Sequence, residues 1–344
     1  MNPALSSTMK TDIRKSGVNP VEELEDIDIV GSNVEDFDAP LFIAWQLNSA
    51  CNLDCLHCCE EAGHKMPDEF NRDEAIDFCR QIIDLKIPYA AISGGEPMLC
   101  PHFFELAEML TSNGVSLKVE TNGMFIGDKE AKRFAKLGMR SIQISIDGAT
   151  AEAHEIMRKR GDFKKTVDAC KLLIENDVNT EIVFVPTKFN IHEIGRAIDM
   201  AYCLGVYGFY TGKIMRIGRA AQNWDLLCPS EEQYAGAFEI LKAKQIQYDG
   251  KMKIYYYPYD VIDELKYRLY HPAASLLVIP NGKVKLIGPL PFLCGDLRRQ
   301  SLKDIWKRYK KAWKEKAVVD FTKRVINDPQ LLCESNRWVE LYLE

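Results

Sequence analysis

Three cysteines with the spacing Cys51-x3-Cys55-x2-Cys58 form the clearest chemical pattern in this sequence. A loop this short directs three thiolates toward one place, which suits an iron–sulfur cluster held by cysteine. Three ligands on a four-iron cluster leave one iron without a protein ligand. An open coordination position is typical of catalytic metal sites, whereas structural sites are closed. The spacing therefore predicts a 4Fe-4S cluster on Cys51, Cys55 and Cys58.

Two other interpretations of the cysteine loop stay open at this point. A structural zinc ion needs four ligands, and a second pair of closely spaced cysteines is usual downstream. The sequence has no such second pair, although His57 or Cys59 could supply a local fourth ligand. The cysteines could also be unligated thiols. Disulfides are not expected, because the N-terminus has no signal-peptide pattern and the cytosol keeps thiols reduced.

The cysteine loop resembles the first motif of the radical S-adenosylmethionine (radical SAM) superfamily, and the stretch Gly94-Gly95-Glu96-Pro97 resembles its second. Each motif follows a strand-like run, and the two together in this order make the resemblance specific. It implies a 4Fe-4S cluster that binds S-adenosylmethionine (SAM) and cleaves it reductively. The resulting 5′-deoxyadenosyl radical would abstract hydrogen from a substrate, while the protein supplies position and exclusion of water.

The same resemblance implies which residues contact SAM. Hydroxyl, amide and carboxylate groups after the third and fourth strands suit ribose and carboxylate recognition. Glycines let the backbone approach the methionine amino group. The expected contacts are His57, Gly94, Gly95, Glu96, Pro97, Thr121, Asn122, Ser145, Asp147, Arg158, Asn190, Arg216 and Gly218.

Several of these assignments have plain structural alternatives. Arg158 lies where many family members pair an arginine with the SAM carboxylate, a task that suits a guanidinium fork, but it could be a solvated helix charge. Asn190 could contact ribose or serve as a turn residue. His57 is expected near adenine, where the family often has an aromatic residue. The segment from Arg216 to Ala220 resembles the sixth-strand segment of the family and is expected to read the adenine edge through its backbone.

Strands and amphipathic helices alternate from residue 40 onward, which predicts a parallel sheet with crossover helices. Six or so such units are too few for a closed eight-stranded barrel. Radical SAM enzymes use a partial (βα)6 TIM-type barrel, so the count agrees with the resemblance. We expect this α/β core over residues 40–225. Catalytic residues of such barrels gather at the C-terminal ends of the strands, where the motifs above lie.

The C-terminal part, residues 226–344, changes character and resembles the small α+β SPASM/twitch extension of some family members. Strand-like runs flank Pro280-Asn281-Gly282, which predicts a hairpin. Related extensions bind auxiliary iron–sulfur clusters, but this sequence lacks most of the expected cysteines. Cys294 and Cys333 are too few for a four-thiolate site. Cys228 and His271 are possible additional ligands. We therefore expect a degenerate extension without an auxiliary cluster, which caps the barrel and shapes the substrate pocket.

The composition restricts the partners. The 344 residues carry a net charge of −6 with no basic stripe, which argues against binding to nucleic acid or to an anionic membrane surface. No apolar run is long enough to cross a bilayer. Residues 1–39 are polar and acidic and are expected to form a partly ordered extension, with a docking arm as the alternative. A cytoplasmic location is expected.

The function expected from the resemblance is a radical SAM maturase that acts on a ribosomal peptide or a peptide-derived cofactor precursor. An electron donor such as flavodoxin or ferredoxin would be its redox partner. The first alternative is a radical SAM enzyme for a small molecule: a sugar, a nucleoside or a tetrapyrrole precursor. The alternative of another class is a zinc-stabilised binding protein.

Overall fold

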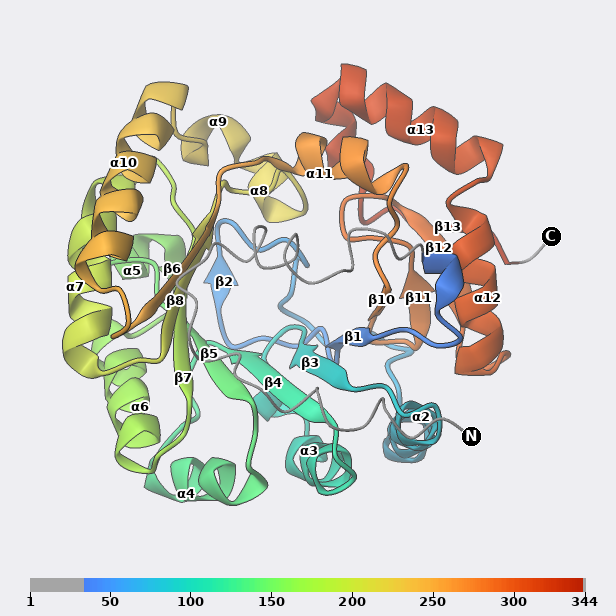
Figure 1. Ribbon diagram of the computed structural model, residues 1–344, viewed down its shortest axis with the longest axis horizontal. Helices are drawn as coiled ribbons and strands as arrows, with labels where there is room; N and C mark the ends of the chain where they lie inside the picture. Colours follow the sequence, from blue (N-terminus) through green and yellow to red (C-terminus); the bar gives the residue numbers. More distant parts are fainter. Residues whose placement is uncertain (1–33, 343–344) are drawn as a thin grey trace, which may run out of the picture.

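The structure is a computed structural model that describes residues 34–342. Its centre is a strongly curved sheet whose convex side is covered by helices (Figure 1). Each strand of the curved part is parallel to its neighbours. In spatial order these strands are β10 (Ser275–Val278), β1 (Phe42–Gln46), β3 (Tyr89–Ser93), β4 (Ser116–Thr121), β5 (Ser141–Ser145), β7 (Thr180–Phe184), β8 (Gly208–Gly212) and β9 (Lys253–Tyr257).

Helices, most of them amphipathic, connect the strands and lie on the outer side of the crescent (Figure 1). The long ones are α2 (Arg72–Asp84), α3 (Phe103–Ser112), α4 (Asp128–Leu137), α6 (Phe163–Glu175), α7 (Ile194–Leu204) and α10 (Glu231–Gln247). Shorter helical segments are η1 (Val34–Asp36), η2 (Pro97–Leu99), α5 (Ala151–Met157), η3 (Ile191–Glu193), α8 (Arg219–Gln222) and α9 (Trp224–Leu227). The partial α/β barrel predicted from the sequence is confirmed.

Side-chain alternation along the strands separates an apolar outer face from a polar inner face. In β1, Ile43 and Trp45 are fully buried on the helix side, where the Trp45 ring meets Phe78 of α2 edge-on at 4.9 Å. In β4, Leu117 and Val119 are buried in the same core, whereas Lys118 and Glu120 are only partly covered. Because successive strand residues point to opposite faces, Lys118 and Glu120 point to the inside of the crescent.

The C-terminal part extends the same sheet. Strands β10 and β11 (Lys283–Lys285) form an antiparallel hairpin around Gly282, whose φ of +78° favours glycine. Then β12 (Phe292–Asp296) and β13 (Val339–Glu340) follow at the edge. The helical segments here are α11 (Val261–Arg268), α12 (Leu302–Ala312), α13 (Lys316–Asn327) and η4 (Pro329–Glu334). The predicted hairpin is confirmed.

The sheet crosses the predicted boundary at residue 225, because β9 pairs with β8 and β10 pairs with β1. The described residues thus form one sheet of eleven strands plus a two-stranded ribbon. The domain boundaries at 39 and 225 stay predictions, and most of the predicted acidic extension (residues 1–33) lies outside the described residues.

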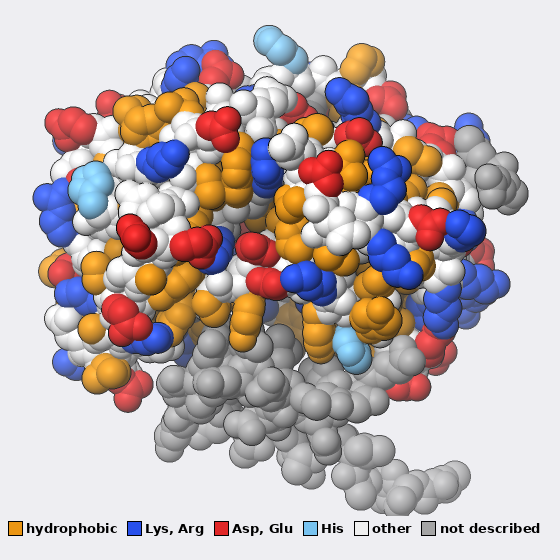
Figure 2. All heavy atoms as spheres, turned by 90° about the horizontal axis from the view of Figure 1, so that it is seen from above, with side chains coloured by type: hydrophobic (Ala, Val, Ile, Leu, Met, Phe, Trp, Pro, Cys, Tyr) orange, Lys and Arg blue, Asp and Glu red, His pale blue; other side chains and the backbone are white. Residues whose placement is uncertain are grey.

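Two observations concern the helices and the surface charge of the molecule. No helix within residues 34–342 combines the length and the apolar character needed to cross a bilayer. Figure 2 shows the side of the molecule that carries α9, α11 and α13, where acidic and basic side chains are interspersed among hydrophobic ones.

Candidate active site

The three cysteines lie in the loop that leaves the C-terminal end of β1, and we call residues 49–59 the cluster loop. Inside it, β2 (Asp54–Cys55) pairs antiparallel with β6 (Arg158–Lys159), so that Cys55 lies opposite Arg158. Cys55 is buried, whereas Cys51 and Cys58 are partly exposed. The loop therefore presents one covered thiol and two partly exposed ones at the C-terminal end of β1.

Hydrogen-bond donors point at two of the three sulfurs. The Leu53 amide donates to Cys51 Sγ at 3.4 Å, and Arg158 Nη1 lies 3.7 Å from Cys55 Sγ. Burial raises the pKa of the Cys55 thiol to about 11, and the positive charge of Arg158 acts in the opposite direction. Donors and a cation beside the sulfurs stabilise thiolates, which is the form that ligates metal.

This donor set fits a cluster. Within residues 34–342 no three His, Cys, Asp or Glu side chains converge as the ligands of a single metal ion. A four-iron cluster with three cysteine ligands binds one thiolate on each of three irons, and the cluster loop supplies three free thiols within eight residues. Within the cluster loop, Nδ1 of His57 is buried and has no hydrogen-bond partner in the described part of the chain.

Arg219 supports the cluster loop from the segment after β8. Its side chain donates from Nε to the Cys55 carbonyl (2.9 Å) and from Nη1 to the Ala62 carbonyl (2.7 Å), while its amide donates to the Cys58 carbonyl (2.9 Å). The preceding Gly218 has φ +57°, and a β-carbon there would lie 2.3 Å from the Cys59 carbonyl oxygen. Sequence reasoning included Arg219 only in the segment expected to read the adenine edge through its backbone. It missed the role of the side chain, because an arginine next to a glycine has no distinctive spacing.

The Gly-Gly pair after β3 allows a close approach to the cluster loop. A β-carbon on Gly94 would lie 2.4 Å from the Asn48 carbonyl oxygen, and one on Gly95 would lie 2.1 Å from that of Ala50. The Gly95 amide donates to Asn48 (2.7 Å) and the Glu96 amide donates to Ala50 (2.8 Å). The structure thus explains both glycines by loop-to-loop contact, and their contact with SAM stays a prediction.

Glu96 is completely buried and joins the ends of β3 and β4. Its carboxylate accepts from the Thr121 hydroxyl (2.8 Å) and from the amides of Asn122 (2.9 Å) and Met98 (3.1 Å). Burial raises its pKa, which these hydrogen bonds oppose. Asn122 then donates to the side chain of Asn52 at 2.9 Å, so the β4 loop is tied to the cluster loop.

Asp147, after β5, binds two of the other predicted site residues. Its Oδ2 lies 2.8 Å from Arg158 Nε and 3.2 Å from His57 Nε2, and its Oδ1 accepts from the Val185 amide (2.8 Å). The carboxylate is fully buried, which by itself would raise its pKa, but the Arg158 guanidinium and the hydrogen bond with His57 hold that pKa well below the usual range. Arg158 is therefore a buried ion-pair partner and no solvated helix charge.

The remaining predicted residues lie around the same edge in different situations. Asn190 is fully buried and completely hydrogen-bonded to Thr187, Val185 and the Asp147 carbonyl, as in a turn. Ser145 ends β5 and is partly exposed. Arg216 lies over the Trp224 ring at 5.2 Å, and Pro97 begins η2. The structure brings the predicted residues to one edge, and their individual SAM contacts stay predictions.

The inside of the crescent is polar below this edge. Lys118 Nζ lies 2.9 Å from Glu181 Oε2 of β7 and 4.5 Å from the Tyr210 ring centre of β8. Glu120 lies two residues after Lys118 in β4 and so on the same face of the strand. Its carboxylate forms no ion pair or hydrogen bond with any described residue. Burial raises its pKa, which the charge of Lys118 opposes. The inner wall thus offers one free carboxylate and one cation that is already paired.

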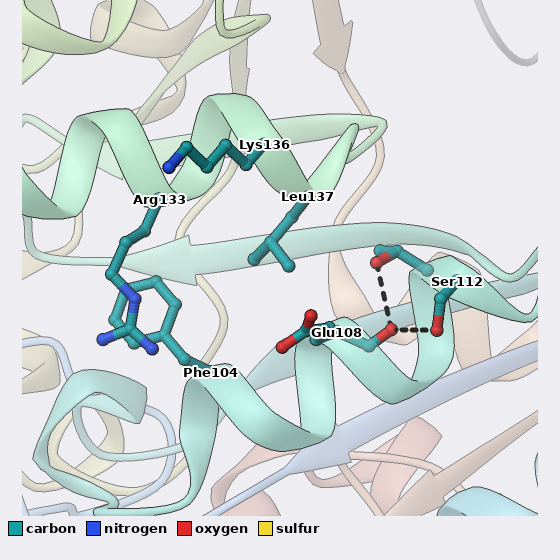
Figure 3. A pocket seen from close by; sticks show the side chains of 7 residues that line it. Phe104, Glu108, Ser112, Arg133, Lys136 and Leu137 are labelled. Carbon is teal, nitrogen blue, oxygen red and sulfur yellow. Dashed lines mark hydrogen bonds between the residues drawn. The ribbon is translucent and has the colours of Figure 1, made fainter.

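A hollow on the outer helix layer lies outside this arrangement. It lies between α3 and α4, where the Arg133 guanidinium covers the Phe104 ring at 3.7 Å (Figure 3). Its lining comes from the convex side of the sheet, away from the cysteine loop, and it has no part in the site.

Residues 45–201 match the sequence profile described as the Radical SAM superfamily. This segment is a radical SAM domain. It contains the three cysteines and the turn from Gly94 to Pro97, so the family assignment and the geometry agree on the same edge of the sheet.

Curated relatives match this chain over different lengths. Mycofactocin maturase MftC of Mycobacterium ulcerans is 35% identical over 211 residues, which cover 60% of this chain and 56% of that protein. The chain thus spans little more than half of that maturase. An AdoMet-dependent heme synthase of Methanosarcina barkeri is 28% identical over 288 residues, which cover 78% of this chain and 82% of that protein.

Solved structures share the fold of the radical SAM domain and of the extension. SuiB of Streptococcus suis, bound to its precursor peptide SuiA, superposes with a TM-score of 0.66 at 16% identity, covering 88% of this chain and 74% of that chain. Such a low identity shows the fold alone. The family itself implies an iron–sulfur cluster and SAM.

Proposed function

We propose that this chain is a radical SAM maturase that holds a 4Fe-4S cluster on Cys51, Cys55 and Cys58. The observation that carries the proposal is the cysteine loop at the C-terminal end of β1, with Arg158 and the Leu53 amide directed at its sulfurs. The radical SAM match over residues 45–201 supports the same site.

The bound cluster would supply one electron to SAM, which breaks into methionine and a 5′-deoxyadenosyl radical that takes a hydrogen atom from the substrate. The chain's own residues position and protect this chemistry. Arg219 and the Gly94-Gly95 turn fix the loop, and the Asp147–Arg158 pair places a compensated cation beside Cys55. The electron would come from a flavodoxin- or ferredoxin-type donor. A cytoplasmic location would bring the protein together with either kind of donor.

A peptide or peptide-derived precursor is the proposed substrate. The mycofactocin maturase relative and the fold shared with a peptide-bound SuiB support this class. The inner wall supports it too, because the Glu120 carboxylate has no side-chain partner within residues 34–342, whereas the Lys118 ammonium already pairs with Glu181. A neutral or cationic peptide segment suits such a wall, since an unpaired carboxylate repels anionic groups.

A tetrapyrrole precursor is the second candidate substrate. The match to a heme synthase over 82% of that protein favours it, because this match includes the C-terminal part. Tetrapyrrole precursors carry several carboxylates, which need unpaired cations in the pocket. Within the described strands, the inner face at Lys118, Glu120 and Glu181 carries an excess of negative charge, and for this reason we rank this candidate second.

The test begins with anaerobic purification, reconstitution with iron and sulfide, and measurement of iron and of 5′-deoxyadenosine formed from SAM with a chemical reductant. The wild type should bind about four irons and cleave SAM. A Cys51/Cys55/Cys58 triple alanine variant should lose both properties, whereas Cys203→Ala, which removes an exposed thiol, should keep them. Bound zinc without iron would contradict the proposal and favour the zinc alternative.

The substrate class is tested separately with deuterium. A peptide encoded by a short reading frame beside the gene, deuterated at carbon, should transfer deuterium to 5′-deoxyadenosine. Transfer from a deuterated porphyrin precursor with none from the peptide would instead support the second candidate.

A further inference from the structure

The C-terminal hairpin is in close contact with the segment that follows the cluster loop. The Phe70 amide donates to the Pro280 carbonyl (2.8 Å), and the Phe70 ring lies so close to Gly282 that a β-carbon would come within 2.0 Å of it. Asn281 donates to the Asp68 carboxylate at 3.2 Å. The extension thus recognises residues 68–70 through backbone and side chains together.

Arg298 completes this first contact. Its guanidinium donates to the carbonyls of Asp68 (3.0 Å) and Asn281 (2.9 Å) and forms a two-point pair with Glu74 of α2. A fifth hydrogen bond runs to the Glu69 carbonyl (3.3 Å). Five bonds from one planar group fix the hairpin, residues 68 and 69 and the start of α2 relative to one another. Arg298 is only about one-third exposed, which limits the screening of these bonds.

Residue 69 carries this contact to the cluster loop. Glu69 Oε1 accepts from the amide of Ser49 (2.8 Å), from its hydroxyl (2.5 Å) and from the Met66 amide (3.0 Å). Ser49 is the first residue of the cluster loop, and its carbonyl accepts from the Gly63 amide at 2.9 Å. A short series of hydrogen bonds therefore runs from Arg298 to the residues that flank Cys51.

A second contact reaches the other end of the loop. Asn336, from the chain between η4 and β13, donates to the Cys59 carbonyl (3.1 Å) and to the Glu61 carboxylate (2.9 Å). The buried ammonium of Lys285 donates to Asn336 Oδ1 (3.2 Å) and to the Gly288 carbonyl (2.6 Å), and so orients the amide. Cys59 directly follows the ligand Cys58.

We propose that the C-terminal extension acts as a clamp that holds both ends of the cluster loop, with Arg298 and Asn336 as positioning residues for the cluster. The inference rests on the proposed function, because it assigns a purpose to the loop that would carry the iron. Groups that orient metal ligands from outside the ligand shell set how firmly the metal is held. The extension thus stabilises the site by hydrogen bonds.

The test compares Arg298→Gln and Asn336→Ala with matched controls on the same elements. Arg299→Gln removes the neighbouring arginine, whose ion pair within residues 34–342 is with Asp296 of the extension itself. Gln330→Ala removes an exposed amide of η4. The first measurement is hydrogen–deuterium exchange of residues 49–63 in the full-length chain without cluster. The second is the rate at which reconstituted protein loses iron to a ferrous chelator.

Both clamp variants should exchange residues 49–63 about tenfold faster, the change that corresponds to one lost hydrogen bond to a charged or buried group. Their iron loss should also be about tenfold faster. Arg298→Lys, which keeps the charge without the planar fork, should lie between wild type and Arg298→Gln. The controls should behave as the wild type.

Wild-type exchange and iron loss in both clamp variants would overturn the clamp. An equal increase of exchange in β4 and β5 would overturn it as well, since that reports general loosening of the fold. A wild type that takes up no iron would overturn the proposed function instead, and the exchange measurement would still judge the clamp by itself.

Discussion

Gly95 lies so close to the cluster loop that a β-carbon would meet the Ala50 carbonyl oxygen at 2.1 Å. Because this neighbour is backbone, a Gly95→Ala variant should shift the loop and cost about 1–3 kcal/mol of unfolding free energy. Urea denaturation measures this loss, and reconstituted iron should fall with it. Gly63→Ala is the matched control, since a β-carbon at that residue would have no neighbouring atom within 4 Å. Equal stability of the two variants would contradict the argument.

Glu120 provides a pH-dependent test of the inner wall. Burial raises its pKa in the folded chain, so the folded state retains the proton to higher pH than the unfolded state and loses stability as pH rises through this window. A Glu120→Gln variant should therefore be more stable than wild type at pH 7, and the difference should vanish toward pH 4. Thermal unfolding across this pH range measures it. Glu108→Gln, at an exposed position of α3, should show no such trend.

Sequence reasoning found the residues at the site better than it found their partners. Spacing alone identified the three cysteines, and the family resemblance added Asp147 and Arg158. It assigned Asp147 to SAM recognition, whereas the structure engages both of its oxygens with Arg158, His57 and Val185. Such pairings join residues far apart in the chain, and a single sequence contains no signal for them.

At the scale of elements, Ser230-Glu231-Glu232-Gln233 has the form of a capping box and predicts a helix that runs to about Ile246, which α10 confirms. Ser230 caps α10, where its hydroxyl accepts from the Gln233 amide (3.2 Å) and the Gln233 side chain accepts from the Ser230 amide (2.9 Å). A Ser230→Ala variant should lose about 1 kcal/mol of unfolding free energy, the usual cost of removing such a cap. Denaturant unfolding measures it, and Ser230→Gly should lose less. A loss below a few tenths of a kcal/mol would show that the cap is dispensable.

Elements without a local signal were not predicted. All five residues of β12 are buried, so the alternation that marks a half-exposed strand is missing. Strands β2, β6 and β13 have two residues each and exist only because tertiary contacts bring their partners together. The sequence predicts a strand over residues 251–257, and β9 forms at Lys253–Tyr257. Its parallel pairing with β8 was not predicted, because register depends on the whole sheet.

At the scale of the whole molecule, the C-terminal extension holds the cluster loop in place. Its hairpin and its C-terminal chain reach the two ends of the cluster loop, one through Arg298 and Glu69 and the other through Asn336. The radical SAM domain and the extension share one sheet. A truncation at residue 225 would therefore expose the edges of β1 and β8 as well as free the loop.

The same architecture predicts how much iron the protein holds. Cys294 is fully buried in β12, its thiol donates to the Val284 carbonyl, and burial raises its pKa to about 12, so it stays a neutral core thiol. Cys333, by contrast, is exposed. A Cys294→Ala/Cys333→Ala double variant should therefore bind the same iron as wild type, about four per chain. Iron and sulfide analysis measures this.

About eight irons in wild type, half of them lost in the double variant and half in the Cys51/Cys55/Cys58 variant, would show that the extension does hold a second cluster. The clamp would then act together with that cluster, because hydrogen bonds alone would no longer account for how the loop is held.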